Sequence, residues 1–114
     1  MIIVDATSAH LAAFYGGAPA VTCRAWAVLD GEQVLGVCGY FKHGIGNMVF
    51  TEMKPELRRH PRVMVSAGWR VLRHLAQLGK PVYAKCDQRI EAAERFLQHF
   101  GFARQPNGVF TWPA

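Results

Sequence analysis

From residue 62 to residue 78 the chain has the hydrophobic period of an α-helix. Most polar residues of this segment fall between its apolar positions; they are Arg62, Arg70, Arg73 and Gln77. This spacing predicts an amphipathic helix with one apolar face. Gly79 and Pro81 mark its end, because glycine adopts the left-handed C′ conformation and proline cannot continue a helix. The apolar positions recur at intervals of three and four, at Met64, Gly68, Val71, Leu72, Leu75 and Leu78.

Upstream of this helix the pattern is that of strands. Asp30-Gly31 separates two segments rich in β-branched and aromatic residues, which is a hairpin signal. A glycine-rich turn follows, and Lys54-Pro55 interrupts the next apolar run. We therefore predict a three-stranded antiparallel meander over residues 21–29, 34–42 and 48–53.

A short helix is expected before the meander. Asp5 or Thr7 is its N-cap, since either side-chain oxygen can accept a hydrogen bond from the unpaired amides of the first turn. Gly16-Gly17 ends the helix after Tyr15.

After Gly79 the chain predicts a strand over residues 81–86 and then a helix capped by Asp87. Gly101 ends that helix, and residues 102–112 form a hairpin around Pro106-Asn107-Gly108. The expected inner face of the helix comprises Ile90, Ala93, Phe96, Leu97 and Phe100.

Composition is that of a folded protein with a basic bias. Apolar residues make up 51% and charged residues 18% of 114 residues, which predicts a single domain over residues 1–114. The formal charge of +5 is concentrated between Lys54 and Arg73 and favours an anionic partner. Neither a secretory signal nor a membrane span is recognisable, so a cytoplasmic location without a membrane partner is expected.

The three cysteines, Cys23, Cys38 and Cys86, are widely spaced and form no CxxC pair. This pattern argues against a disulfide framework and a structural zinc site, and predicts buried thiols. No metal site is expected.

Two segments carry a resemblance to a known family. The helix end Phe100-Gly101-Phe102 and the segment from Met53 to Val63, which contains Pro55, Glu56 and Arg58, resemble the GNAT superfamily of N-acetyltransferases. The chain is also similar to short GNAT-like proteins encoded by tailed phages. The resemblance implies an α+β mixed sheet with three α/β/α layers, in which an antiparallel meander precedes βαβα and a terminal hairpin.

The same resemblance implies binding of acetyl-CoA at the start of the long helix. The family's glycine positions are occupied here by Arg59, Pro61 and Val63, so a cradle of backbone amides is disfavoured. Arginine side chains can instead hold a pyrophosphate through charge-assisted bidentate bonds. The cofactor-binding residues expected are Met53, Arg58, Arg59, Arg62 and Val63.

The resemblance also implies catalytic positions. Glu52 is the only acidic residue on the third predicted strand and is the expected general base. Its alternative role is that of an outward-facing strand residue paired with Lys54 or a neighbour. The main-chain amide near Met53 is expected to polarise the thioester carbonyl. Leu97 occupies the position at which the family commonly has a tyrosine that acts as general acid. Tyr83 or Cys86 is the alternative proton donor to the leaving thiolate.

Two functions remain as hypotheses. The first is an N-acetyltransferase that transfers an acetyl group from acetyl-CoA to an amine. The second is an inactive GNAT-like protein, phage structural or nucleic-acid-binding, that contacts phosphates through its basic segment and is associated with a virion. A homo-oligomer built through the hairpin at residues 102–112 is a further hypothesis.

Overall fold

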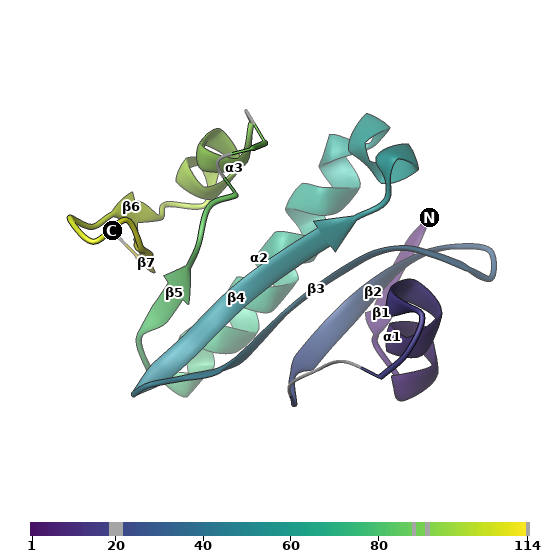
Figure 1. Ribbon diagram of the computed structural model, residues 1–114, viewed down its shortest axis with the longest axis horizontal. Helices are drawn as coiled ribbons and strands as arrows, with labels where there is room; N and C mark the ends of the chain where they lie inside the picture. Colours follow the sequence, from purple (N-terminus) through teal and green to yellow (C-terminus); the bar gives the residue numbers. More distant parts are fainter. Residues whose placement is uncertain (19–21, 88, 91, 114) are drawn as a thin grey trace.

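In the computed structural model, the described residues form one mixed sheet of seven strands, in the order β1-β2-β3-β4-β5-β7-β6 (Figure 1). The structure describes residues 1–18, 22–87, 89–90 and 92–113. The strands are β1 (Ile2–Asp5), β2 (Arg24–Asp30), β3 (Gln33–His43), β4 (Gly46–Met53), β5 (Val82–Ala84), β6 (Ala103–Arg104) and β7 (Phe110–Trp112). The helices are α1 (Ser8–Tyr15), α2 (Pro61–Leu78) and α3 (Ala93–His99), and a 3₁₀ helix, η1 (Pro55–Arg59), precedes α2.

The helices cover both faces of the sheet. Leu11 and Phe14 of α1 pack with Ala27, Val37 and Phe50 on one face. The larger cluster on the other face joins the apolar side of α2 to the strands and to Phe100 and Phe102 after α3. This arrangement confirms the expected α+β class with a mixed sheet, and Figure 1 shows α1 and α2 on opposite sides of it.

The helix boundaries follow local chemistry. The Thr7 side chain accepts from the amide of His10, and the His10 ring accepts from the amide of Thr7, so Thr7 rather than Asp5 is the N-cap of α1. Gly16 ends α1 with a φ of 77°, and Gly79 ends α2 with a φ of 66°. Both helices were predicted, and Pro61 occupies the first turn of α2.

The meander is also confirmed. β2, β3 and β4 pair in antiparallel succession, and β3 extends to His43 while β4 begins at Gly46. The predicted start of the first strand, Val21, lies outside the described residues. The strand β1 was not predicted; it pairs antiparallel with β2 and forms one edge of the sheet.

The prediction for the segment after α2 was wrong in three respects. Only Val82–Ala84 pairs as a strand, instead of residues 81–86. Asp87 does not cap α3, because its carboxylate accepts from the amide and guanidinium of Arg89, and α3 begins only at Ala93. Ile90 is 42% exposed and not part of an inner helix face.

The 3₁₀ helix η1 joins β4 to α2 and is anchored by one residue. The side chain of Leu57 is completely buried. A Cβ atom at Gly36 would lie 2.5 Å from Leu57 Cδ2, so any larger residue at this position of β3 would have to displace the anchor. The anchor fixes where the basic segment stands relative to the end of β4. No helix in the described part of the chain is long and apolar enough to cross a membrane.

Candidate functional site

The site lies where β4 and β5 separate. These parallel strands pair at three positions, Asn47↔Val82, Met48↔Tyr83 and Val49↔Ala84. β4 then continues to Met53 beside β3 alone, while the chain after Ala84 turns away. The divergence is visible in Figure 1 between the blue β4 and the green β5. We call the space between residues 50–53 and residues 85–87 the β4–β5 gap.

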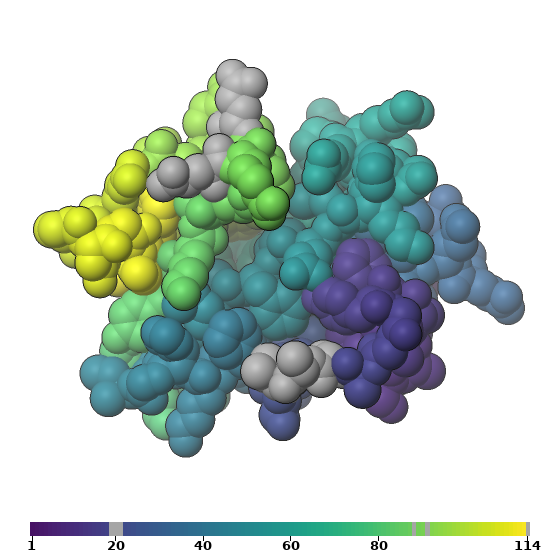
Figure 2. Space-filling view, viewed as in Figure 1, coloured from purple at the N-terminus to yellow at the C-terminus, as the bar shows by residue number. Residues whose placement is uncertain are grey.

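A pocket of about 580 Å³ occupies the β4–β5 gap. Figure 2 shows the hollow between the green segment that follows β5 and the teal η1. Its walls come from β4, η1, the first turn of α2, the end of β5 and α3. The lining is mostly apolar and includes Val49, Phe50, Met53, Leu57, Met64, Phe96 and Leu97, with Thr51, Glu52, Arg58, Lys85, Cys86 and Asp87 as its polar members.

The backbone of β4 presents unpaired groups to the gap. The amide of Lys54 donates to Leu35 O on β3, whereas the amide of Asn47 donates to Pro81 O on the β5 side. Because successive residues of a strand direct their amides to opposite sides, Thr51 and Met53 direct their N–H and C=O groups into the gap. This edge can pair with an extended ligand that carries amide groups.

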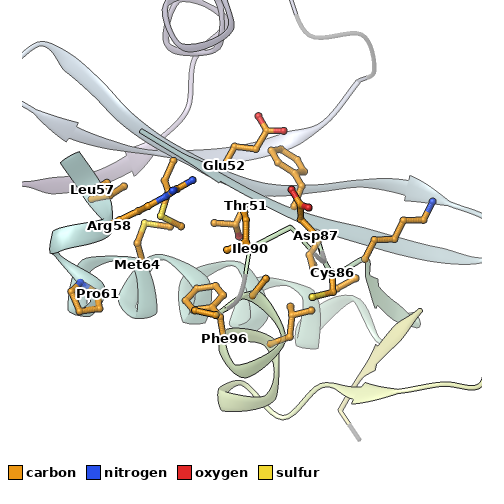
Figure 3. A pocket seen from close by; sticks show the side chains of 18 residues that line it. Thr51, Glu52, Leu57, Arg58, Pro61, Met64, Cys86, Asp87, Ile90 and Phe96 are labelled. Carbon is orange, nitrogen blue, oxygen red and sulfur yellow. The ribbon is translucent and has the colours of Figure 1, made fainter. Parts of the chain in front are cut away.

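The side chains of β4 divide between the two faces of the sheet. Val49 and Met53 pack with the apolar cluster that covers α2, which we call the α2 cluster. Phe50 packs with the apolar cluster that covers α1, which we call the α1 cluster. Glu52 lies on the α1 face by the same alternation, and Figure 3 shows its carboxylate directed away from Met64 and Pro61. The gap therefore has an acidic group on one face and η1 with Arg58 on the other.

The negative charge of Glu52 acts on Tyr15, the last residue of α1. Burial and this charge raise the pKa of Tyr15 well above its usual range. The alternative expected for Glu52, a surface pair with Lys54, is not among the ion pairs of the described residues.

The predicted cofactor-binding residues are only partly brought together. Met53 and Arg58 line the pocket, as does the predicted base Glu52. Arg59 and Arg62 are exposed and do not line it. Val63 is half-buried and packs against the α2 cluster, and it too lies outside the lining. None of the three arginines forms an ion pair with an acidic residue that the structure describes.

The start of α2 offers few free amides. Pro61 has no N–H, the amide of His60 donates to Leu57 O, and that of Val63 donates to His60 O. The macrodipole still favours an anion at this position. An anionic group here would be held mainly by side chains, of which Arg58 is the one that faces the pocket.

Comparisons of the chain with protein-family models, with curated proteins and with solved structures found no match.

The wall opposite β4 lacks a tyrosine. Leu97 lines the pocket, so the position at which the resemblance would place a tyrosine acid is apolar here. Cys86 also lines the pocket. Burial is the main effect that raises the pKa of its thiol, and the negative charges of Glu94 and Asp87 raise it further, while the charge of Arg104 lowers it. Hydrogen bonds from Arg89 lower the pKa of Asp87.

Several lining residues were missed by the sequence analysis, among them Thr51, Lys85 and Met64. The alternation of β4 could have suggested Thr51, since it follows Val49 on the same face. The prediction of three buried thiols was correct only for Cys38, because Cys23 and Cys86 are partly exposed. Within the described residues, no three His, Cys, Asp or Glu side chains are grouped as metal ligands.

Proposed function

We propose that this chain has a GNAT-like acyltransferase fold and transfers an acetyl group from acetyl-CoA to an amine. The observation that carries the proposal is the separation of the parallel strands β4 and β5 beyond Val49 and Ala84, which opens the pocket through the sheet. The antiparallel meander, the parallel β4–β5 pair and the terminal hairpin also support it.

The pocket suits the pantetheine arm of acetyl-CoA. That arm is an extended chain with two amide groups, and the unpaired N–H and C=O groups of Thr51 and Met53 offer it a strand edge. The apolar walls from Leu57, Met64 and Phe96 suit its methylene groups. Arg58, at the η1 end of the pocket, is placed to contact the pyrophosphate.

The proposed chemistry needs one base and one polarising group. The acceptor arrives as an ammonium ion and gives a proton to the Glu52 carboxylate. The amine nitrogen then attacks the thioester carbonyl carbon while the Met53 amide donates to the carbonyl oxygen. The C–S bond breaks as the C–N bond forms. The attacking nitrogen must lose one more proton, which passes through water in the open gap to the CoA thiolate.

Thermal denaturation with acetyl-CoA tests the proposal. A ligand that binds only the folded state at about 100 times its Kd adds about 2.7 kcal/mol of stability. For a domain of this size that corresponds to a rise in Tm of about 10 °C. We expect this rise at about 1 mM acetyl-CoA, and its absence would contradict the proposal.

Arg58→Ala tests how the cofactor is held. Loss of a charge-assisted bond weakens binding by roughly 10- to 100-fold, so the variant should show a much smaller rise in Tm. Arg73→Ala is the matched control, because Arg73 is exposed on α2 and does not line the pocket. Equal rises in the two variants would place the pyrophosphate elsewhere.

A nucleic-acid-binding or phage structural role is the second candidate. It is favoured by Arg59 and Arg62, which are exposed, lie outside the pocket and have no described ion-pair partner. Binding of fluorescent DNA should then weaken steeply with salt. The double variant Arg59→Ala/Arg62→Ala should reduce the salt slope by about one for each arginine. DNA binding without any acetyl-CoA shift would favour this role over the enzyme.

A further inference from the structure

We propose that the acceptor is a free amino acid, whose ammonium group meets Glu52 and whose carboxylate is held by Lys85. The inference rests on the proposed function and names the class of amine that the site takes. It brings the second wall of the β4–β5 gap into acceptor binding, since Lys85 directly follows β5.

Lys85 is directed to the same face of the sheet as Glu52. Its neighbours Ala84 and Cys86 both pack with the α2 cluster, so alternation along the chain directs Lys85 to the α1 face. Glu52 pairs directly with Val37 of β3, which belongs to the α1 cluster, and residues opposite each other in a sheet share a face. The two charged side chains therefore stand on the α1 side of the gap.

Both side chains line the pocket, Glu52 from β4 and Lys85 from the segment after β5. Both residues are exposed, and neither takes part in an ion pair between residues that the structure describes. β4 and β5 no longer pair at this level, which leaves room for a ligand between the two walls. A ligand that enters here meets a carboxylate on one wall and an ammonium group on the other.

An amino acid carries the two complementary charges. Its ammonium group donates to the Glu52 carboxylate, which is the contact that the proposed proton transfer needs, and its carboxylate accepts from the Lys85 ammonium group. A diamine would instead place its second positive charge beside Lys85, and like charges repel. An amine without a carboxylate gains nothing from Lys85.

The other charged groups on this side favour the same class of acceptor. Asp87 also lines the pocket, but it accepts hydrogen bonds from the guanidinium of Arg89, which counters its charge. Lys54 adds a positive charge outside the pocket lining, with its Nζ 6.0 Å from the ring centroid of Phe14 in the α1 cluster. The surroundings of Glu52 thus favour an acceptor with a negative charge of its own.

Matched pairs of acceptors test the assignment. Glycine and leucine should be acetylated with values of kcat/KM roughly 10- to 100-fold above those of glycinamide and leucinamide, the effect of one bond between charged groups. Equal values for the free acids and their amides would overturn the proposal.

Variants of the lysines identify the group that binds the carboxylate. Lys85→Gln should lose most of the preference for free acids while kcat/KM for the amides stays unchanged, and Lys85→Glu should favour the amides. Lys80→Gln is the matched control, because Lys80 is exposed between α2 and β5 and does not line the pocket. Equal losses in Lys85→Gln and Lys80→Gln, or a loss in Lys54→Gln alone, would show that Lys85 does not hold the carboxylate.

The same measurements separate this inference from the proposed function. If acetyl-CoA raises the Tm and amines are acetylated without any preference for free acids, only the inference is refuted. If no amine is acetylated, the proposed function is refuted and the inference with it.

Discussion

Burial is the main influence on the pKa of the Cys38 thiol. Cys38 lies in β3, is 2% exposed and packs on the α2 face of the sheet. Burial raises the pKa of its thiol from 9.0 to about 12, against the opposing charge of Arg70. The folded protein therefore keeps a proton on Cys38 at pH values at which the unfolded chain loses it.

This difference predicts alkaline destabilisation. Between pH 9.0 and about 12 the unfolded state binds fewer protons than the folded state, so stability falls as pH rises. The fall should approach about 1.4 kcal/mol per pH unit for this one group. Cys38→Ala should be less stable at neutral pH but should show a shallower loss, measured by urea denaturation from neutral to alkaline pH. Identical slopes in the two proteins would contradict the prediction.

Among individual residues, the sequence analysis identified some that line the pocket and others that do not. Arg58 and Arg59 are adjacent, yet only Arg58 lines the pocket. In a 3₁₀ helix each residue is turned by about a third of a revolution from the last, so neighbours face different directions. The sequence signalled basic charge here but not the 3₁₀ helix, and therefore could not distinguish the two arginines.

Among the elements, η1 depends on a single anchor. Leu57 is its buried residue, and the adjacent Arg58 extends into the pocket. If Leu57 is lost, η1 loses its contact with the sheet at Gly36, and the position of Arg58 is no longer fixed.

Leu57→Ala should therefore affect both stability and binding. Removing a fully buried leucine side chain costs about 2–5 kcal/mol. The acetyl-CoA-dependent rise in Tm should also shrink. Leu78→Ala is the matched control, because Leu78 is 45% exposed and should cost far less by urea denaturation. Equal losses in the two variants would show that η1 is not anchored through Leu57.

The segment before α3 shows why an element boundary was misjudged. Asp87 has the residue type of an N-cap, but its carboxylate binds the amide and guanidinium of Arg89 in a local turn. Aspartate stabilises turns and helix starts with the same oxygen atoms, so its presence alone does not distinguish them. Asp87, Ile90 and Ala92 form part of one wall of the pocket.

For the whole molecule, the two sheet edges determine whether copies associate. The edge strand β6 has two residues, and at the other edge Arg70 donates to Ile3 O of β1. Short strands and covered carbonyls both oppose edge-to-edge pairing. Oligomerisation through the hairpin at residues 102–112 remains a hypothesis from sequence.

Arg70→Ala should uncover the β1 edge. We expect the variant to self-associate more than the wild type, measured by light scattering after size exclusion. Arg73→Ala removes the same charge from an exposed position on α2 and is the control. If both variants associate equally, net charge rather than edge protection is responsible.

Local features of the sequence determined α1, α2 and the meander, since hydrophobic period, caps and turn glycines act within a few residues. Only the tertiary structure decided that β5 pairs with β4 for three positions and then leaves it. That separation depends on contacts between segments more than thirty residues apart. β1 is too short to show a period, so its place at the edge also depended on pairing with β2. The sequence thus supplied the charged groups, and long-range pairing placed Glu52 and Arg58 at one pocket.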